Sequence, residues 1–181
     1  MWVAHLIRGH GRPCFMQVIV VDLQIRPLAG DDIDAVVQLS VLAWAPVFSS
    51  FAQVLGPAIY PIVYPDWRKQ QAEAVEAVCK DTAKYTIWVA EVGGAVVGFI
   101  AYVLNSDEKT GEVDLLAVHP DYQNEGIGTD LNNFALGKMR EAGMRLAVVG
   151  TGGDPGHAPA RRSYEKAGYT GLPLVRYYKD L

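Results

Sequence analysis

The segment 115–128 holds the residues whose types and spacing most clearly suggest a chemistry. It joins an apolar run to a polar loop, and the loop ends in Gly126-Ile127-Gly128. A helix that begins at these glycines would offer unpaired N–H groups and the positive end of its dipole, and both favour a bound phosphate. Without side chains, the glycines would let a diphosphate approach the amides closely. Tight packing of the helix on a strand explains the same two glycines equally well.

The elements that must position this segment follow from hydrophobic periodicity. Strands are expected at 17–26, 85–91, 95–104, 112–118 and 144–150, the last of them buried, with one or two more around 174–178. Helices are expected from Asp32 to a break at Pro46, from Pro65 through Cys79, at 126–142 and at 158–167. The aromatic, proline-rich stretch 47–65 receives no assignment. This order fits neither a Rossmann alternation nor an all-β fold, so it predicts one mixed α/β domain.

Composition excludes several classes of function. The 181-residue chain has a net charge of −4 and an isoelectric point near 5.5, so no overall positive field attracts nucleic acid. Cys14 and Cys79 are far apart and histidines are few, so the sequence offers no obvious metal site. We expect two free, non-catalytic thiols in a reducing cytoplasm.

The N-terminal residues 1–15 are interpreted as an extension without a catalytic role, followed by a single domain over 16–181. The apolar run 15–21 follows two arginines, as in a signal peptide, but Gln17 interrupts it and no small-x-small cleavage site follows. It is also too short to span a bilayer, so we expect no membrane association from it.

Two motifs resemble those of the GCN5-related N-acetyltransferases, the GNAT family. Gln123-Asn124-Glu125-Gly126-Ile127-Gly128 matches the family's acetyl-CoA loop, Gln/Arg-x-x-Gly-x-Gly/Ala, and residues 116–120 match the strand before it. Residues 160–169, Ala-Arg-Arg-Ser-Tyr-Glu-Lys-Ala-Gly-Tyr, look like the second motif, Ala-x-x-x-Tyr-Glu-Lys-x-Gly-Phe. Two motifs in this order, about 35 residues apart, are far more specific than either alone.

The resemblance implies a mixed, mostly antiparallel central sheet flanked by helices (an α/β, or α+β, fold). In it, the parallel strands 112–118 and 144–150 would splay to admit the pantetheine arm of acetyl-CoA, and the loop amides would hold the pyrophosphate without a metal. It assigns contacts with acetyl-CoA to Leu116, Ala117, Val118, Gln123, Asn124, Glu125, Gly126, Ile127, Gly128, Thr129, His157 and Tyr164. Two residues depart from the family pattern. Glu125 is acidic beside a diphosphate, and His157 replaces a common asparagine, either as a donor to pantetheine or as a helix cap.

The resemblance also implies the catalytic groups. Glu112 stands where several members carry a glutamate base, and Asp114, two residues on, shares its face and would attract a cationic acceptor. Glu112 and Asp114 could equally be ordinary exposed carboxylates on an amphipathic strand. Tyr164 matches the tyrosine that protonates the CoA sulfur, and its alternative is a half-buried aromatic in a short helix. Trp44, Phe48 and Tyr64 would line the acceptor pocket or pack in the core.

The expected function is therefore transfer of an acetyl group from acetyl-CoA to a primary amine of a small molecule or protein. The alternatives are a non-catalytic acyl-CoA-binding sensor or regulator, and a structural domain that uses its glycine loop only for packing. The sequence identifies neither the acceptor nor the acyl chain length, and it leaves a homodimer open.

Overall fold

The computed structural model of the protein describes residues 22–181. The predicted N-terminal extension 1–15, Cys14 and the first part of the strand predicted at 17–26 lie outside the described residues. The rest of that strand is found as β1, Leu23–Pro27.

Five strands form one sheet in the order β1–β2–β3–β4–β5. They are β1, then β2 (Thr86–Val92), β3 (Ala95–Asn105), β4 (Thr110–Val118) and β5 (Leu146–Val149). The first three pairings are antiparallel, and β4 pairs with β5 in parallel. Gly93 and Gly94 turn the β2–β3 hairpin with φ values of 59° and 84°, which a two-residue turn of this hand requires. The mixed, mostly antiparallel sheet predicted from the sequence is confirmed.

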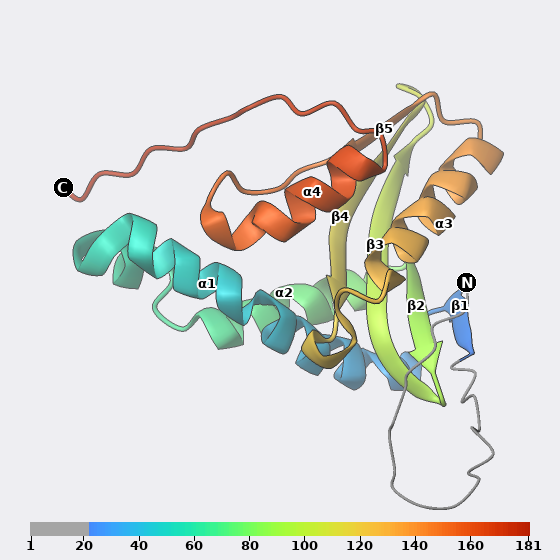
Figure 1. The fold of residues 1–181 in the computed structure, drawn as a ribbon, viewed down its shortest axis with the longest axis horizontal. Coiled ribbons are helices and arrows are strands. Elements are labelled where there is room, and N and C mark those ends of the chain that lie inside the picture. The colour runs from blue at the N-terminus through green and yellow to red at the C-terminus, as the bar shows by residue number, and fades with distance from the viewer. Residues whose placement is uncertain (1–21) are drawn as a thin grey trace, which may run out of the picture.

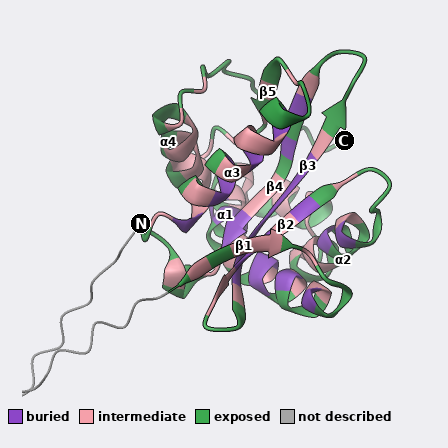
Figure 2. Cartoon of the chain, turned by 90° about the vertical axis from the view of Figure 1, so that its right-hand side faces the viewer, coloured by how far each residue is buried: buried purple, intermediate pink, exposed green. Residues whose placement is uncertain are grey.

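Helices cover both faces of the sheet (Figure 1). Helices α1 (Ile33–Val63) and α2 (Trp67–Lys80) pack on one face through a buried cluster that includes Leu39, Val75 and Phe99. Helix α3 (Ile127–Glu141) packs on the other face through Leu131, Ala135 and Met139. The buried residues therefore follow the sheet and the inner sides of these helices (Figure 2). The remaining helices are α4 (Ala158–Lys166) and the short 3₁₀ turns η1 (Gly30–Asp32), η2 (Pro120–Tyr122) and η3 (Pro155–His157).

The prediction that Pro46 ends the first helix was wrong. Helix α1 runs through Pro46 and bends at Gly56, whose φ of 69° and ψ of 178° are not helical. Pro46 has no N–H, so the carbonyl of Leu42 loses its helical hydrogen-bond partner. Pro46 and Leu42 are both exposed, so water can solvate this carbonyl. The buried Val47 and Phe48 directly after the proline fix the helix against its neighbours. The unassigned stretch 47–65 is thus mostly helical.

In the described part of the chain, one helical segment, Gly30–Val63, is long and apolar enough to cross a membrane by length and composition alone. One match of this kind does not distinguish a membrane span from the long helix of a folded domain. This segment bends at Gly56 and packs on the sheet through Val36 and Leu39.

Two sequence predictions near the C-terminus were also wrong. Strand β5 is not buried: Leu146 is 58% exposed and Val148 is 38% exposed, because among the described residues β5 has a strand neighbour on one side only. The strands expected around 174–178 do not form. Residues 169–181 carry no regular secondary structure and run as an extended trace past α4 toward the end of α1 (Figure 1). Their apolar side chains, such as Leu174, therefore stay exposed.

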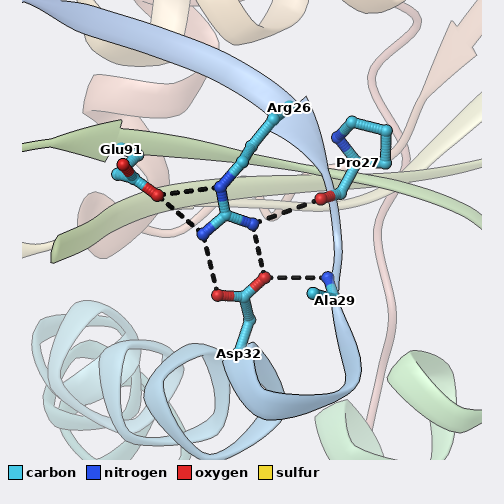
Figure 3. A network of polar contacts seen from close by, with 5 residues as sticks. All are labelled: Arg26, Pro27, Ala29, Asp32 and Glu91. Carbon is cyan, nitrogen blue, oxygen red and sulfur yellow. Dashed lines mark hydrogen bonds and ion pairs between the residues drawn. The ribbon is translucent and has the colours of Figure 1, made fainter. Parts of the chain in front are cut away.

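An ion-pair network ties β1 and β2 to the start of α1 (Figure 3). The guanidinium of Arg26 donates to both carboxylate oxygens of Asp32, at 2.6 and 2.9 Å, and to Glu91 at 2.8 Å. The N–H of Ala29 also donates to Asp32, at 2.8 Å. The hydrogen bond from Arg26 outweighs burial and lowers the pKa of Asp32. This network fixes the angle at which α1 leaves the sheet.

Replacing Asp32 by asparagine should lower the free energy of unfolding by about 2 kcal/mol at pH 7, since a charged, mostly buried acceptor is lost. Folding lowers the pKa of Asp32. The stability that Asp32 contributes is therefore complete above its pKa in the unfolded chain, about 3.9, and is lost as the pH falls through its pKa in the folded protein. The difference between wild type and Asp32→Asn should therefore shrink below about pH 4.

Urea unfolding at pH 7, 5 and 3 measures this difference. Asp31→Asn is the matched control, because Asp31 is the exposed neighbour of Asp32. Equal losses in the two variants, or a difference for Asp32→Asn that persists unchanged at pH 3, would contradict the assignment.

Candidate active site

A cleft opens where β4 and β5 stop pairing. The two strands pair from Thr110 with Leu146 to Val113 with Val149, where β5 ends, while β4 continues to Val118. The N–H and C=O groups of 114–118 that point away from β3 therefore have no strand partner within residues 22–181. The cleft has a volume of about 680 Å³, and its walls include both strand ends, the loop after β4, the start of α3, and parts of α1 and α4. The predicted splay is found.

A β-bulge places Asp114 at the mouth of this splay. Tyr102 pairs with Val113 and Ala101 with Leu115, so Asp114 is the extra residue on β4. Val113 packs in the core on the α3 side, so the adjacent Asp114 faces the α1 side, where it lines the cleft.

Glu112 does not line the cleft. It pairs with Val148, where β4 and β5 are still joined, and its side chain is exposed. It shares a face with Asp114, as expected, but it lies on the paired side of the opening. The role of Glu112 as the base therefore stays a prediction.

The loop after β4 is built to present its main chain. The side-chain amide of Gln123 donates to the carbonyl of Val118 at 2.9 Å and ties the loop to the strand end. Asn124 and Gly126 have φ values of 67° and 92°, a left-handed conformation that asparagine and glycine tolerate. Helix α3 then begins at Ile127 without a side-chain cap, so its first N–H groups remain free for a ligand.

The two loop glycines have different roles. A Cβ added to Gly126 would meet no atom within 4 Å, so this residue borders open space in the cleft. A Cβ on Gly128 would lie 3.5 Å from Val118 and 3.7 Å from Leu116, so this residue packs on β4. Packing on a strand therefore explains Gly128, while the role of Gly126 beside a phosphate stays a prediction.

Helix α4 contributes a tyrosine and two cations. Tyr164 lines the cleft and packs edge-on against Tyr169, with ring centroids 5.7 Å apart. Burial, with a smaller effect of Tyr169, raises the pKa of Tyr164 from near 10 to about 12, so the phenol is protonated at neutral pH. Arg162 and Lys166 line the same cleft and supply positive charge.

The predicted acceptor-side aromatics separate into two groups. Trp44 lines the cleft, but Phe48 and Tyr64 do not. Phe48 stacks on Trp67 at 4.4 Å and packs edge-on against Tyr64 at 5.3 Å, which places both residues in the contact between α1 and α2. The structure shows Phe48 and Tyr64 in ring packing between the helices, and their role at the acceptor pocket stays a prediction.

Most of the cofactor contacts predicted from the sequence come together in the cleft, and Glu125 is the exception, because its side chain is exposed and lies outside the lining. The predicted residues that line the cleft are Leu116, Ala117, Val118, Gln123, Asn124, Gly126, Ile127, Gly128, Thr129, His157 and Tyr164.

Sequence reasoning missed Asp154. Its carboxylate lies 2.5 Å from Nδ1 of His157. The spacing Asp-x-x-His before a helix start is the only signal that could have pointed to it.

Among residues 22–181, no group of three or more His, Cys, Asp or Glu residues is arranged to hold a metal ion. Cys79 is free and buried, and burial raises the pKa of its thiol to about 11.

The model of the acetyltransferase (GNAT) family matches residues 56–169. The chain therefore belongs to the GNAT family of acetyltransferases.

Relatives and solved structures agree with this assignment. A mycothiol acetyltransferase of Streptomyces bingchenggensis is 31% identical over 83 residues, which are 46% of this chain and 26% of that protein. The chain thus matches about a quarter of that relative's length. An N-acetyltransferase, PaiA of Thermoplasma acidophilum in complex with coenzyme A, superposes with a TM-score of 0.67 at 16% identity, covering 85% of this chain and 93% of that one. A GNAT-family structure from Desulfovibrio desulfuricans gives a TM-score of 0.68 at 20% identity, with coverage of 86% and 89%. At these identities the two structures establish the fold.

The raised pKa of Tyr164 can be measured directly. In protein labelled with ¹³C at tyrosine Cζ, the Tyr164 signal, assigned by its loss in Tyr164→Phe, should keep its neutral shift up to pH 10.5. An unperturbed phenol is more than half ionised at that pH. A midpoint near pH 10 for Tyr164 would show that the phenol is solvated and not held in the protonated form.

Proposed function

We propose that this protein transfers an acetyl group from acetyl-CoA to a primary amine of a small molecule or a protein. The observation that carries the proposal is the convergence of three features in one cleft. They are the free N–H groups at the start of α3, the unpaired edge of β4 and the protonated Tyr164.

Each feature suits one part of acetyl-CoA. The helix start and the left-handed loop residues Asn124 and Gly126 suit the pyrophosphate. The free edge at 114–118 can pair with the amides of the pantetheine arm as an added strand would. Arg162 and Lys166 add positive charge for the phosphates of the nucleotide end.

The chemistry is attack of a neutral amine on the thioester carbonyl, followed by cleavage of the C–S bond. The hydroxyl of Tyr164 donates a hydrogen bond to the sulfur as negative charge develops there, and the thiol forms through it. Asp114, which lines the cleft, favours a cationic acceptor.

Turnover is tested by release of free thiol from acetyl-CoA with a panel of amino acids, polyamines, aminoglycosides and peptides. Tyr164→Phe should lower kcat on the order of tenfold or more with little change in the Kd for CoA, because the lost bond forms mainly in the transition state. Tyr122→Phe, at another tyrosine of the cleft, is the matched control and should keep its kcat. Tight CoA binding without thiol release in wild type would contradict the enzyme and favour a binding module.

The pyrophosphate assignment is tested with the two glycines that flank α3, one before its start and one after its end. Gly126→Ala should weaken CoA binding at least tenfold by calorimetry, because a methyl group would occupy open space beside the helix start. Gly143 also has a positive φ, 77°, with nothing within 4 Å of an added Cβ. Gly143→Ala should cost similar stability, about 1–2 kcal/mol, without affecting CoA affinity. Equal CoA affinities for the two variants would refute the site.

A further inference from the structure

The loop between β5 and α4 carries a carboxylate–imidazole pair at the cleft. Nδ1 of His157 lies 2.5 Å from Oδ1 of Asp154, and the two side chains are 17% and 8% exposed. The loop is shaped around this pair. A Cβ on Gly152 would fall 2.4 Å from the Asp154 carboxylate and 2.5 Å from the imidazole.

Asp154 is fixed from several sides. It accepts the N–H of Gly156 at 2.9 Å, and this N–H also lies 3.0 Å from the hydroxyl of Ser50 on α1. Burial acts to raise the pKa of Asp154, but hydrogen bonds from Ser50 and His157 outweigh it and hold that pKa below its usual range. At neutral pH Asp154 is therefore an ionised carboxylate, which can only accept hydrogen bonds.

This carboxylate determines which nitrogen of His157 carries the proton. The nitrogen beside Asp154, Nδ1, must donate, so in the neutral imidazole the lone pair is on Nε2. Within residues 22–181, Nε2 forms no hydrogen bond. The ring lines the cleft, and Nε2 is its free base nitrogen.

His157 stands on the side of the cleft formed by α1. Its ring lies 5.6 Å from that of Phe51, and Trp44 and Val47 of the same helix also line the cleft. His157 directly precedes α4, and Tyr164 lies on that helix seven residues further along the chain. Both residues line the cleft. Helix α4 and the residue before it therefore present a proton donor and a base to one cleft.

We propose that His157, oriented by Asp154, is the general base that takes a proton from the acceptor amine. This inference rests on the proposed acetyl transfer. The ammonium gives one proton to Nε2, and its nitrogen lone pair then bonds to the thioester carbon. As the C–S bond breaks, the sulfur takes the proton of Tyr164, and the second N–H proton of the intermediate restores that hydroxyl. His157 passes its proton to solvent, so the ammonium and the thioester become an amide and a thiol with one proton released.

Asp154→Asn separates catalysis from loop packing. The asparagine oxygen can still accept from Gly156, while its NH₂ group donates to Nδ1 and moves the proton to Nε2. The variant should keep the melting temperature of wild type, and its Kd for CoA should change by no more than about twofold. Its kcat/KM should fall about 100-fold or more, and His157→Gln should behave in the same way.

The pH profile is the decisive kinetic readout, taken with the best amine of the panel. Wild type should show the acidic inflection of a histidine base, and both variants should lose it and follow the free-base fraction of the acceptor. Arg161→Gln is the control for a loosened loop, because Arg161 donates to the carbonyls of Gly152 and Asp154. It should keep the inflection. Wild-type kcat/KM in Asp154→Asn would overturn the proposal.

The tautomer gives a test that does not depend on turnover. In ¹⁵N-histidine-labelled protein, His157 should carry its proton on Nδ1 in wild type and on Nε2 in Asp154→Asn. A proton on Nε2 in wild type would overturn the base assignment even if acetyl transfer is confirmed. The Nδ1 tautomer in a wild type that releases no thiol would instead refute the proposed function, and with it the base.

Discussion

The site depends on where the parallel pairing of β4 and β5 stops. Pairing ends at Val113 and Val149, and the bulge at Asp114 follows at once. Beyond this point β4 keeps its antiparallel partner β3, while its other edge has no strand neighbour among the described residues. Unpaired main-chain groups at a strand edge are normally satisfied by another strand or by water. Here they line a cleft, and a ligand with its own amides can take the place of the missing strand.

The two sides of the cleft come from distant parts of the chain. The loop after β4 and the start of α3 supply main-chain donors, and α3 packs on the sheet through Ile127 and Leu131. The opposite side is formed by α1 and the loop before α4, which are joined by the contact between Ser50 and Gly156. Helix α1 is in turn fixed at its start by Arg26 and Asp32. Helix α1 thus links the Arg26–Asp32 ion pair at its start to the loop that carries His157.

The sequence predicted what depends on local pattern. Strand alternation, the Gly93-Gly94 turn and the glycines at the start of α3 each have a physical cause within a few residues, and all were found. The errors depend on tertiary context. Burial of Val47 and Phe48 carries α1 through Pro46, and the exposure of β5 follows from its lack of a second strand neighbour. Glu112 and Asp114 share a face, but only the observed register shows that Glu112 lies where β4 is still paired with β5, while Asp114 stands at the bulge where this pairing has ended. The pKa of Asp154 is lowered in part by a hydrogen bond from Ser50, which lies 104 residues earlier in the chain.

Amide hydrogen exchange with and without CoA tests the added-strand account most directly. The account predicts that the amides of 115–118 that point away from β3 exchange rapidly in the free protein and become protected when CoA is added. Amides of β1 and β2, which lie away from the cleft, should be unaffected. Protection of the start of α3 without any change in these β4 amides would contradict the account, because the pantetheine arm would then not occupy the splay.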